Sequence, residues 1–191
     1  MTNNKGKTAR LQLLLIALVF LGPLVLATWL YFGGSALQPA GRTNHGELLQ
    51  PLINIRDVLP ESPIHEHNDG HWLLIYPNSA VCDAGCEFAL YTLRQSRLML
   101  GKEMGRLVRV FLYGESAPDT VYLADEHAGL ITLSDSGFST LLNNKRPSEL
   151  TAGGYYLVDP LGNLVMYFPP DIEPGDMVAD IKRLLKFSRI G

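Results

Sequence analysis

The chain contains two cysteines, Cys82 and Cys86, and both lie in the short segment CDAGC. In an oxidising compartment, such a lone and close pair is either a disulfide or a redox or metal site. A loop this short adds little entropic stability, so a disulfide with a purely structural role would be a weak use of the pair. The spacing therefore favours reversible thiol–disulfide chemistry or metal binding, and a static disulfide is the alternative.

A helix that begins near Cys82 would place the two cysteines on one face, with their Cβ atoms about 5–6 Å apart. That separation allows a disulfide or shared metal ligation. The positive end of the helix would favour the thiolate, which attacks disulfides and binds soft metals such as Cu(I). Asp83 and Glu87 oppose this effect by adding negative charge. The alternative role for either carboxylate is to accept hydrogen bonds from the first amides of the helix.

Histidines are further candidate ligands, if the fold brings them to the cysteines. His65, His67 and His71 form a His-x-His-x-x-x-His run. His71 begins a predicted strand that leads to Cys82, and six residues at about 3.3 Å each span roughly 20 Å. We expect this run to form a solvated turn at the opposite edge of the sheet, with an independent weak metal site as the alternative. His127 is the histidine that we retain as a candidate for the cysteine site.

The cysteines follow a predicted buried strand, His71–Tyr76 (HWLLIY), which is a nearly continuous apolar run. Helical spacing of apolar residues then predicts a helix of about 18 residues over EFALYTLRQSRLMLGKEMG, and Leu107–Tyr113 predicts a second strand. This order implies a right-handed crossover between parallel strands. The cysteines then lie at the carboxyl end of the sheet, where open α/β folds place their sites. The basic side chains of the helix region are expected to be solvated: Arg94, Arg97, Lys102 and Arg106.

The second half of the domain predicts a hairpin and a closing helix. Tyr155–Val158 and Leu164–Phe168 are β-rich runs that flank a turn containing Pro, Gly and Asn. Pro174–Phe187 is amphipathic, with Pro at its start and basic residues near its end. Thr120–Leu142 has weaker patterns that we assign to a helix and a loop. The order of elements is that of a thioredoxin-like α/β fold, with a central mixed sheet flanked by helices.

An apolar segment precedes this domain. Leu11–Phe32 has 22 residues without a charge, and at about 1.5 Å per residue it spans roughly 33 Å, enough to cross a bilayer core. A cleaved signal peptide is the alternative, but its apolar stretch would be shorter and would end at a small-residue site. Lys5, Lys7 and Arg10 precede the span, and the first acidic residue is Glu47. The positive-inside rule therefore predicts a cytoplasmic N-terminus.

These patterns predict a cytoplasmic N-terminus (residues 1–10), a transmembrane helix (11–32), a linker (33–50) rich in Gly, Ala, Pro and polar residues, and a thioredoxin-like domain (51–191). We expect a single-pass protein of the inner membrane with its C-terminal domain in the periplasm, if the organism is a Gram-negative bacterium. The membrane is thus its first predicted partner.

The net charge of the domain limits which classes of partner are expected. From Thr43 onward there are 12 Lys/Arg, which is the total of 16 less four, against all 19 Asp/Glu, so the formal charge is −7. An acidic domain argues against nucleic acid as a partner. It is compatible with a basic partner, although net charge also serves solubility alone.

Two segments resemble the Sco/SenC copper chaperones. IYPNSAVCDAGCEFALYTL is similar to the segment in which a strand leads to a Cys-x-x-x-Cys at a helix start, and YYLVDPLGNLVMYF is similar to that family's hairpin. The likeness extends over roughly residues 52–188. In that family, the two cysteines and a histidine just before the hairpin bind copper destined for cytochrome c oxidase, and some members are thiol oxidoreductases. The resemblance thus implies a cytochrome c oxidase assembly protein whose site is Cys82 and Cys86, with copper as cargo and oxidase subunits or other assembly factors as partners.

The sequence departs from this pattern at several positions. Thr151 occupies the position of the copper-binding histidine, and no histidine follows His127. The prolines that flank the family's cysteines are missing, and no proline directly precedes Tyr155, where thioredoxins carry a cis-proline. We therefore expect weak, two-coordinate Cu(I) binding at most. The alternatives are a non-catalytic assembly scaffold with a static disulfide and a general thiol–disulfide oxidoreductase.

Overall fold

The computed structural model describes residues 5–33, 44–114, 116, 118–188 and 190. The chain divides between Thr43 and Asn44 into two compact units. The first contains one described helix, α1 (Lys5–Gly33). The second is an α/β domain built on one mixed sheet.

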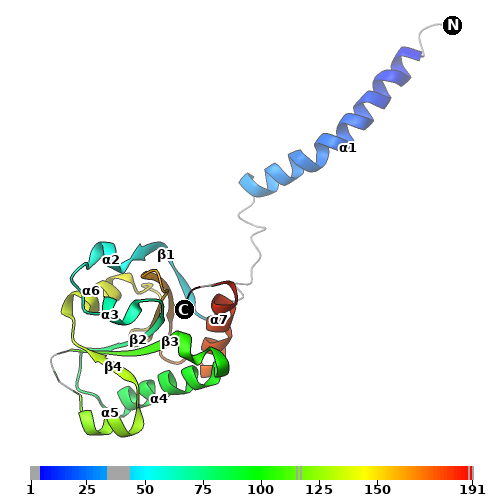
Figure 1. Ribbon diagram of the computed structural model, residues 1–191. Coiled ribbons are helices and arrows are strands. Elements are labelled where there is room, and N and C mark those ends of the chain that lie inside the picture. The colour runs from blue at the N-terminus through cyan, green and yellow to red at the C-terminus, as the bar shows by residue number, and fades with distance from the viewer. Residues whose placement is uncertain (1–4, 34–43, 115, 117, 189, 191) are drawn as a thin grey trace. The chain divides into compact units, whose positions relative to one another are not determined.

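The sheet has six strands in the order β1-β6-β5-β2-β3-β4 (Figure 1). β2, β3 and β4 are parallel to one another, whereas β5 is antiparallel to β2, β6 to β5, and β1 to β6. The parallel part therefore contains the predicted crossover, and the hairpin extends the sheet on the other side of β2. The strands are β1 (Glu47–Asn54), β2 (Trp72–Asn78), β3 (Leu107–Tyr113), β4 (Leu130–Leu133), β5 (Tyr155–Val158) and β6 (Asn163–Phe168).

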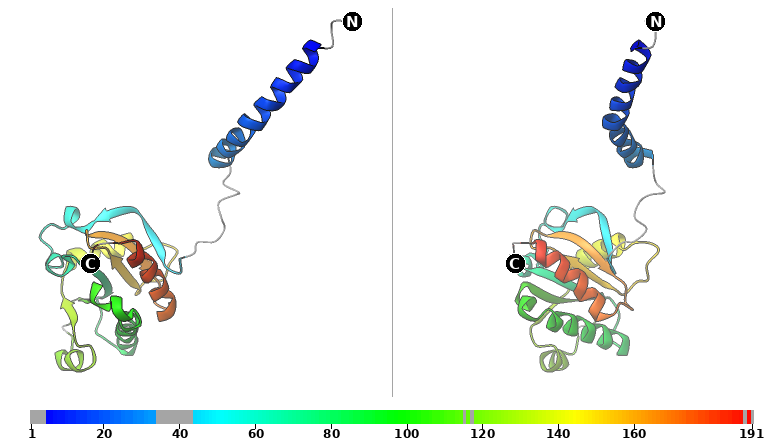
Figure 2. Two further views of the ribbon diagram at one scale, coloured as in Figure 1. Left: turned by 45° about the vertical axis from the view of Figure 1, so that its right-hand side comes forward. Right: turned by 90° about the vertical axis from the view of Figure 1, so that its right-hand side faces the viewer.

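Helices cover both faces of the sheet, and Figure 2 shows the two long helices α4 and α7 side by side on one of them. Their apolar residues share a core with alternate residues of β2, such as Leu74. A second core lies on the other face, where Leu73 and Ile75 pack with Phe138 and Leu142 of α6. β2 is therefore buried on both faces, which explains its continuous apolar sequence. The helices are α2 (Ile55–Val58), α3 (His65–Asn68), α4 (Ala84–Met99), η1 (Gly101–Arg106), α5 (Thr120–Glu126), α6 (Ser136–Lys145) and α7 (Pro174–Phe187).

The predicted thioredoxin-like arrangement is confirmed, with differences at the edges of the sheet. The segment expected to hold a helix and a loop contains α5, the edge strand β4 and most of α6. The helix after the cysteines ends at Met99, before Gly101, whose φ of 62° favours glycine and interrupts the helix. The hairpin strands and the closing helix lie where they were predicted, with β6 beginning one residue earlier.

The domain begins before residue 51, so the expected linker boundary at residue 50 is wrong. Glu47–Asn54 forms edge strand β1, whose pairing with β6 is interrupted between Leu48 and Ile53. Pro51 lies in that interruption, where a missing N–H does not remove a ladder hydrogen bond. This proline, in the middle of the segment, hides the strand pattern in the sequence.

The start of the domain is attached to α7 by a buried carboxylate. Asp180 Oδ2 accepts hydrogen bonds from His45 N at 2.7 Å and Gly46 N at 2.8 Å. Gly46 fits tightly, because a Cβ there would lie 2.5 Å from the Phe168 ring. Arg183 adds a hydrogen bond to Asn44 at 3.1 Å. The boundary of the folded domain is therefore set by contacts with its last helix.

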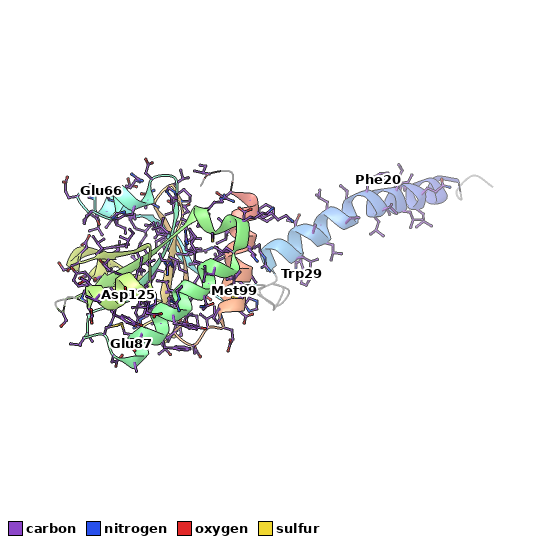
Figure 3. All side chains as sticks on the ribbon, turned by 60° about the horizontal axis from the view of Figure 1, so that its bottom comes forward. Phe20, Trp29, Glu66, Glu87, Met99 and Asp125 are labelled. Carbon is purple, nitrogen blue, oxygen red and sulfur yellow. A yellow bond between two sulfur atoms is a disulfide. The ribbon has the colours of Figure 1, made fainter. Side chains whose placement is uncertain are left out.

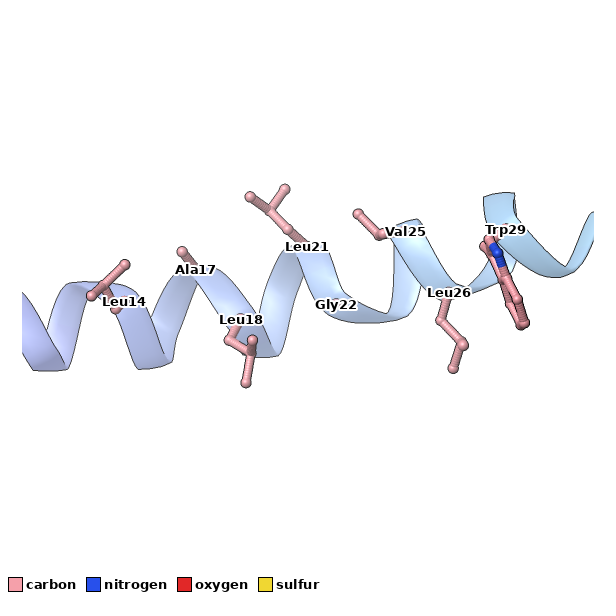
Figure 4. Close-up of a pocket in the computed structure, with 8 residues that line it drawn as sticks. All are labelled: Leu14, Ala17, Leu18, Leu21, Gly22, Val25, Leu26 and Trp29. Carbon is pink, nitrogen blue, oxygen red and sulfur yellow. The ribbon is translucent and has the colours of Figure 1, made fainter. Parts of the chain in front are cut away.

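α1 contains the apolar segment expected to cross a membrane. Arg10–Leu30 is long and apolar enough to span a bilayer, and none of it is buried within the chain. Pro23 lies inside this helix, as bilayer helices tolerate. Figure 4 shows side chains between Leu14 and Trp29 that line a shallow apolar groove formed by α1 alone. Such a surface suits lipid hydrocarbon, so it is not a candidate functional site.

Candidate functional site

The cysteines lie just beyond the carboxyl end of β2, as the sequence predicts for a site on parallel strands. The backbone N–H of Gly114, after β3, donates to Asn78 O at 3.0 Å. A Cβ at Gly114 would lie 2.7 Å from the Ser79 backbone. Glycine is required there because the ends of β2 and β3 approach closely. This contact holds the start of the cysteine loop in place.

Cys82 and Cys86 form a disulfide with a Cα–Cα distance of 5.1 Å. The helix begins at Ala84, two residues after Cys82. The reason is Asp83, a strongly preferred N-cap residue, whose Oδ1 accepts a hydrogen bond from Cys86 N at 3.0 Å. Cys82 therefore precedes the cap, and Cys86 lies in the first turn of α4. The alternative role considered for Asp83 is its actual one.

The two sulfurs differ in accessibility. Cys86 is 2% exposed and belongs to the core beneath α4, whereas Cys82 is half-buried. Cys82 also lines a cleft of about 290 Å³ next to α5. In the reduced state, a partner would therefore reach Cys82 before Cys86. The cleft is lined by Val81, Cys82, Glu87, Ser116, Pro118, Asp119, Tyr122 and Leu123.

Two tyrosines support the first turns of α4. Tyr155, in β5, donates a hydrogen bond from its hydroxyl to Ala89 O at 3.4 Å, and its ring packs against that of Tyr76. Burial raises the pKa of Tyr155 to about 12, so the hydroxyl remains a donor at neutral pH. Burial and then the Asp83 charge raise the pKa of Tyr76. Both rings are thus neutral supports for the helix that carries Cys86.

Carboxylates give the cleft negative character. Glu87 and Asp119 line it, and Asp119 caps α5 by accepting hydrogen bonds from Val121 N and Tyr122 N at 2.9 and 3.1 Å. Burial and then the charge of Glu87 raise the pKa of Tyr122, which keeps its hydroxyl neutral. Carboxylates near a thiol favour its protonated form. They therefore oppose the effect of the α4 N-terminus on Cys82, as the sequence indicates.

His127 lies behind the cleft wall, and no contact brings it to the sulfurs. It is 2% exposed, and its Nε2 is 3.4 Å from the Tyr122 hydroxyl. Burial, followed by the charges of Arg94 and Arg109, lowers the pKa of His127, so the imidazole is neutral at pH 7. In the part of the chain that the structure describes, His, Cys, Asp and Glu form no group of three that could hold a metal. His127 thus supports Tyr122, and its described contacts do not join it to the cysteine site, for which it was a candidate.

The histidines of the run His65, His67 and His71 lie at the amino end of β2, away from the cysteines as expected. His65 Nε2 is 2.6 Å from Leu59 O, and His71 Nδ1 is 2.8 Å from Asp69 O. His65 and His67 belong to the short helix α3 and are half-buried, whereas His71 is exposed, so the expected solvated turn is only partly confirmed. The run is occupied with local backbone contacts.

Thr151 lies before β5. The antiparallel register that pairs Ile75 with Tyr156 directs this segment toward the cysteine end of the sheet. The Thr151 side chain is exposed, and its carbonyl accepts a hydrogen bond from the Tyr167 hydroxyl. Gly154 directly precedes β5, and a Cβ there would lie 2.0 Å from Phe168 O. The position of the thioredoxin cis-proline is thus filled by a glycine that allows close packing on β6.

The expected solvated basic face is largely wrong. Arg94 binds Glu126 at 3.2 Å, Arg97 donates to Leu107 O at 2.8 Å, and Arg106 donates to Leu185 O at 3.1 Å. All three are half-buried, and only Lys102 of the four is exposed. These arginines connect α4 and η1 to neighbouring elements, because guanidinium groups can reach backbone carbonyls while their stems pack.

Asp119 and Tyr122 are site residues that the sequence reasoning missed. They lie at the beginning of α5, in or next to the segment left as a helix and loop. The available signal was an Asp before Thr120-Val121-Tyr122, which is typical of a helix N-cap. The spatial relation of α5 to Cys82 had no signal of this kind.

The fold and the paired sulfurs define a thioredoxin-like domain. Residues 72–188 match a family model described as transmembrane-like, thioredoxin-like, C-terminal domain, and residues 5–34 match one described as transmembrane-like, N-terminal domain. The chain belongs to this transmembrane-like, thioredoxin-like family. The family match supports α1 as a membrane-anchor-like segment. No curated protein matches the chain.

Solved Sco structures are similar in fold. Copper-bound Sco1 from yeast is 20% identical, with a TM-score of 0.51, over 65% of this chain and 81% of that chain. Copper-bound ScoI from Arabidopsis thaliana is 19% identical, with a TM-score of 0.51, over 65% and 89%. Apo Sco1 from Thermus thermophilus is 17% identical, with a TM-score of 0.50, over 74% and 91%. The predicted resemblance to Sco proteins is confirmed for the fold.

Proposed function

We propose that the chain is a membrane-anchored thiol–disulfide exchange protein in which Cys82 attacks and Cys86 resolves. The observation that carries this proposal is the unequal accessibility of the sulfurs: Cys82 lines an open cleft, whereas Cys86 is buried one turn away. A purely structural disulfide does not require its first sulfur to face a cleft. The disulfide state is the oxidised form of this pair.

The exchange conserves atoms and electrons. The Cys82 thiolate attacks a partner disulfide, so a Cys82–partner bond forms and the partner's second sulfur leaves as a thiolate, which takes up a proton. Cys86, after losing its proton, then attacks the Cys82 sulfur, so the Cys82–Cys86 bond forms and the partner's first sulfur leaves as a thiolate, which takes up a proton. Counted from the two thiols, including the proton that Cys82 lost to form its thiolate, two electrons and two protons have moved from this chain to the partner. The reverse sequence oxidises a partner dithiol.

Thiol trapping of the full-length protein in non-ionic detergent across a glutathione series tests the proposal. We expect the native pair to interconvert between dithiol and disulfide without unfolding. Cys86→Ser should form a mixed disulfide with glutathione, and Cys82→Ser should do so at least about tenfold more slowly because Cys86 is buried. A native pair that glutathione cannot reduce would favour the static-disulfide scaffold.

The exchange site is proposed to lie outside the cytoplasm, in the periplasm of a Gram-negative cell. Lys5, Lys7 and Arg10 before the apolar segment support this orientation. A reporter that is active only in the periplasm, fused after Gly191, should be active. Cytoplasmic reporter activity would overturn the orientation.

A second candidate function is transient Cu(I) binding during cytochrome c oxidase assembly. Two soft sulfurs at a Cα–Cα distance of 5.1 Å, in a fold similar to copper-bound Sco1, favour it. The donor set suits Cu(I), but it lacks the histidine that would suit Cu(II). Oxidase subunits would be the partners. Deletion of the gene should reduce assembled oxidase in membranes, and the Cys82→Ser protein should not restore it.

A further inference from the structure

The cleft that exposes Cys82 has a consistent charge. Its described lining includes two carboxylates, Glu87 and Asp119, and no Lys, Arg or His. Both residues are exposed, as is Asp83 beside the disulfide. Asp119 uses Oδ1 to cap α5, and its exposed carboxylate also lines the cleft. A cysteine that enters this cleft therefore approaches through negative potential.

Apolar side chains are exposed beside the same opening. Val81, which lines the cleft directly before Cys82, is 70% exposed. Phe88, next to Glu87 in α4, is 64% exposed and stacks on Tyr91 at 6.5 Å. Val121, two residues after Asp119, is 69% exposed. Exposed apolar groups in the lining of a cleft and in the residues next to that lining are typical of a surface that a partner covers.

We propose that the partner is a polypeptide segment whose cysteine is flanked by basic and apolar residues. This inference rests on the proposed exchange function and names its substrate class. The carboxylates attract Lys or Arg beside the partner cysteine and repel acidic segments, while Val81 and Phe88 cover its apolar neighbours. Charge complementarity sets the rate of encounter with the cleft, and apolar contact prolongs it.

Mixed-disulfide formation with synthetic peptides tests this specificity. The full-length Cys86→Ser protein in non-ionic detergent is mixed with peptides whose cysteine carries a thionitrobenzoate leaving group. The Cys82 thiolate attacks the peptide sulfur, and coloured thionitrobenzoate is released as the second-order rate constant is measured. The peptides are matched: one has Lys on each side of Leu-Cys, one has Glu there, and one has Lys but Ser in place of Leu.

We expect the Lys peptide to react at least about tenfold faster than the Glu peptide at low ionic strength, with the ratio falling toward one as salt rises. Replacing Leu by Ser should slow the Lys peptide about threefold. Glu87→Gln with Asp119→Asn should collapse the Lys-to-Glu ratio, while Asn still caps α5. The ratio cancels any change in the reactivity of Cys82 itself, since both peptides meet the same thiolate.

The matched control is Glu66→Gln with Asp69→Asn, which removes two exposed carboxylates at the other end of the sheet. In the view of Figure 3, Glu66 and Glu87 lie on opposite sides of the domain. The control should leave the ratio unchanged. Equal rates for all peptides would overturn the specificity but leave the exchange function intact. Absence of reaction with every peptide would instead overturn the exchange function.

Discussion

The two ends of β2 both carry a dense run of potential metal ligands, but the fold uses them differently. At the amino end, His65 and His71 contact nearby backbone carbonyls. At the carboxyl end, Cys86 is buried while Cys82 lines a cleft. The amino end, which has more ligand-type residues, is therefore the end whose histidines hydrogen-bond to the local backbone. Accessibility to a partner, rather than the density of ligand-type residues, distinguishes the candidate site.

The largest effect should come from removing one sulfur. Cys82→Ser should weaken Cu(I) binding to the reduced protein by at least about a hundredfold, because even outer-shell partners contribute 10–100-fold to metal affinity. Competition with a coloured Cu(I) chelator measures this. The triple variant of His65, His67 and His71 to Asn should bind Cu(I) like the native protein. A loss of Cu(I) affinity in the triple variant would show that the amino end of β2 also contributes to metal binding.

A substitution at the amino end of β2 should change the free energy of unfolding of the domain. Asn68 is fully buried, and its Nδ2 donates to His71 O at 3.0 Å and Asp159 O at 2.9 Å. Asn68→Ala leaves these carbonyls without their donor and should cost about 2 kcal/mol of unfolding free energy. Chemical denaturation measures it, with His67→Asn as a control expected within about 0.5 kcal/mol. Glutathione exchange at Cys82 should stay unchanged, and a parallel loss of exchange would argue against separate roles.

A smaller gain is expected from restoring a ligand at the carboxyl end. Thr151→His should tighten Cu(I) binding about tenfold, since imidazole replaces a hard hydroxyl oxygen beside two soft sulfurs. The same chelator competition applies. Thr140→His, at an exposed position of α6, is the matched control and should leave Cu(I) affinity unchanged. Equal affinities in both variants would show that the segment before β5 does not reach the sulfurs.

The smallest effect concerns pH. Burial, then Arg94 and Arg109, lowers the pKa of His127 in the folded state, so the unfolded chain binds a proton first on acidification. Stability from the neutral imidazole is present above the unfolded pKa of about 6.5 and is lost as pH falls below it. Thermal unfolding at about pH 7.5 and 5.5 should show a smaller decrease for His127→Gln than for the native protein. If the decrease in thermal stability were the same in His127→Gln as in the native protein, His127 would be exposed to solvent in the folded state.

The central elements were predictable because local patterns specify them. β2 is a continuous apolar run, the turn of the β5–β6 hairpin contains Pro, Gly and Asn, and α7 begins with Pro. The edge strands were not predictable in this way. β1 contains Pro51, and no residue of β4 is fully buried, so each depends on the strand beside it. An edge strand is partly exposed and has a weaker sequence pattern than a buried one.

The candidate site divides along the same line. The sequence alone predicts three features of the site and its anchor, because each is a property of neighbouring residues. They are the two closely spaced cysteines after a buried strand, Asp83 at the start of the helix, and the long apolar N-terminal segment. Tertiary structure alone decided which sulfur is accessible from the cleft. Cys86 is buried because it packs in the core shared by α4 and α7, and Cys82 borders a cleft because α5 lies beside it. Burial is set by what covers a residue, and here the covering elements come from distant parts of the chain.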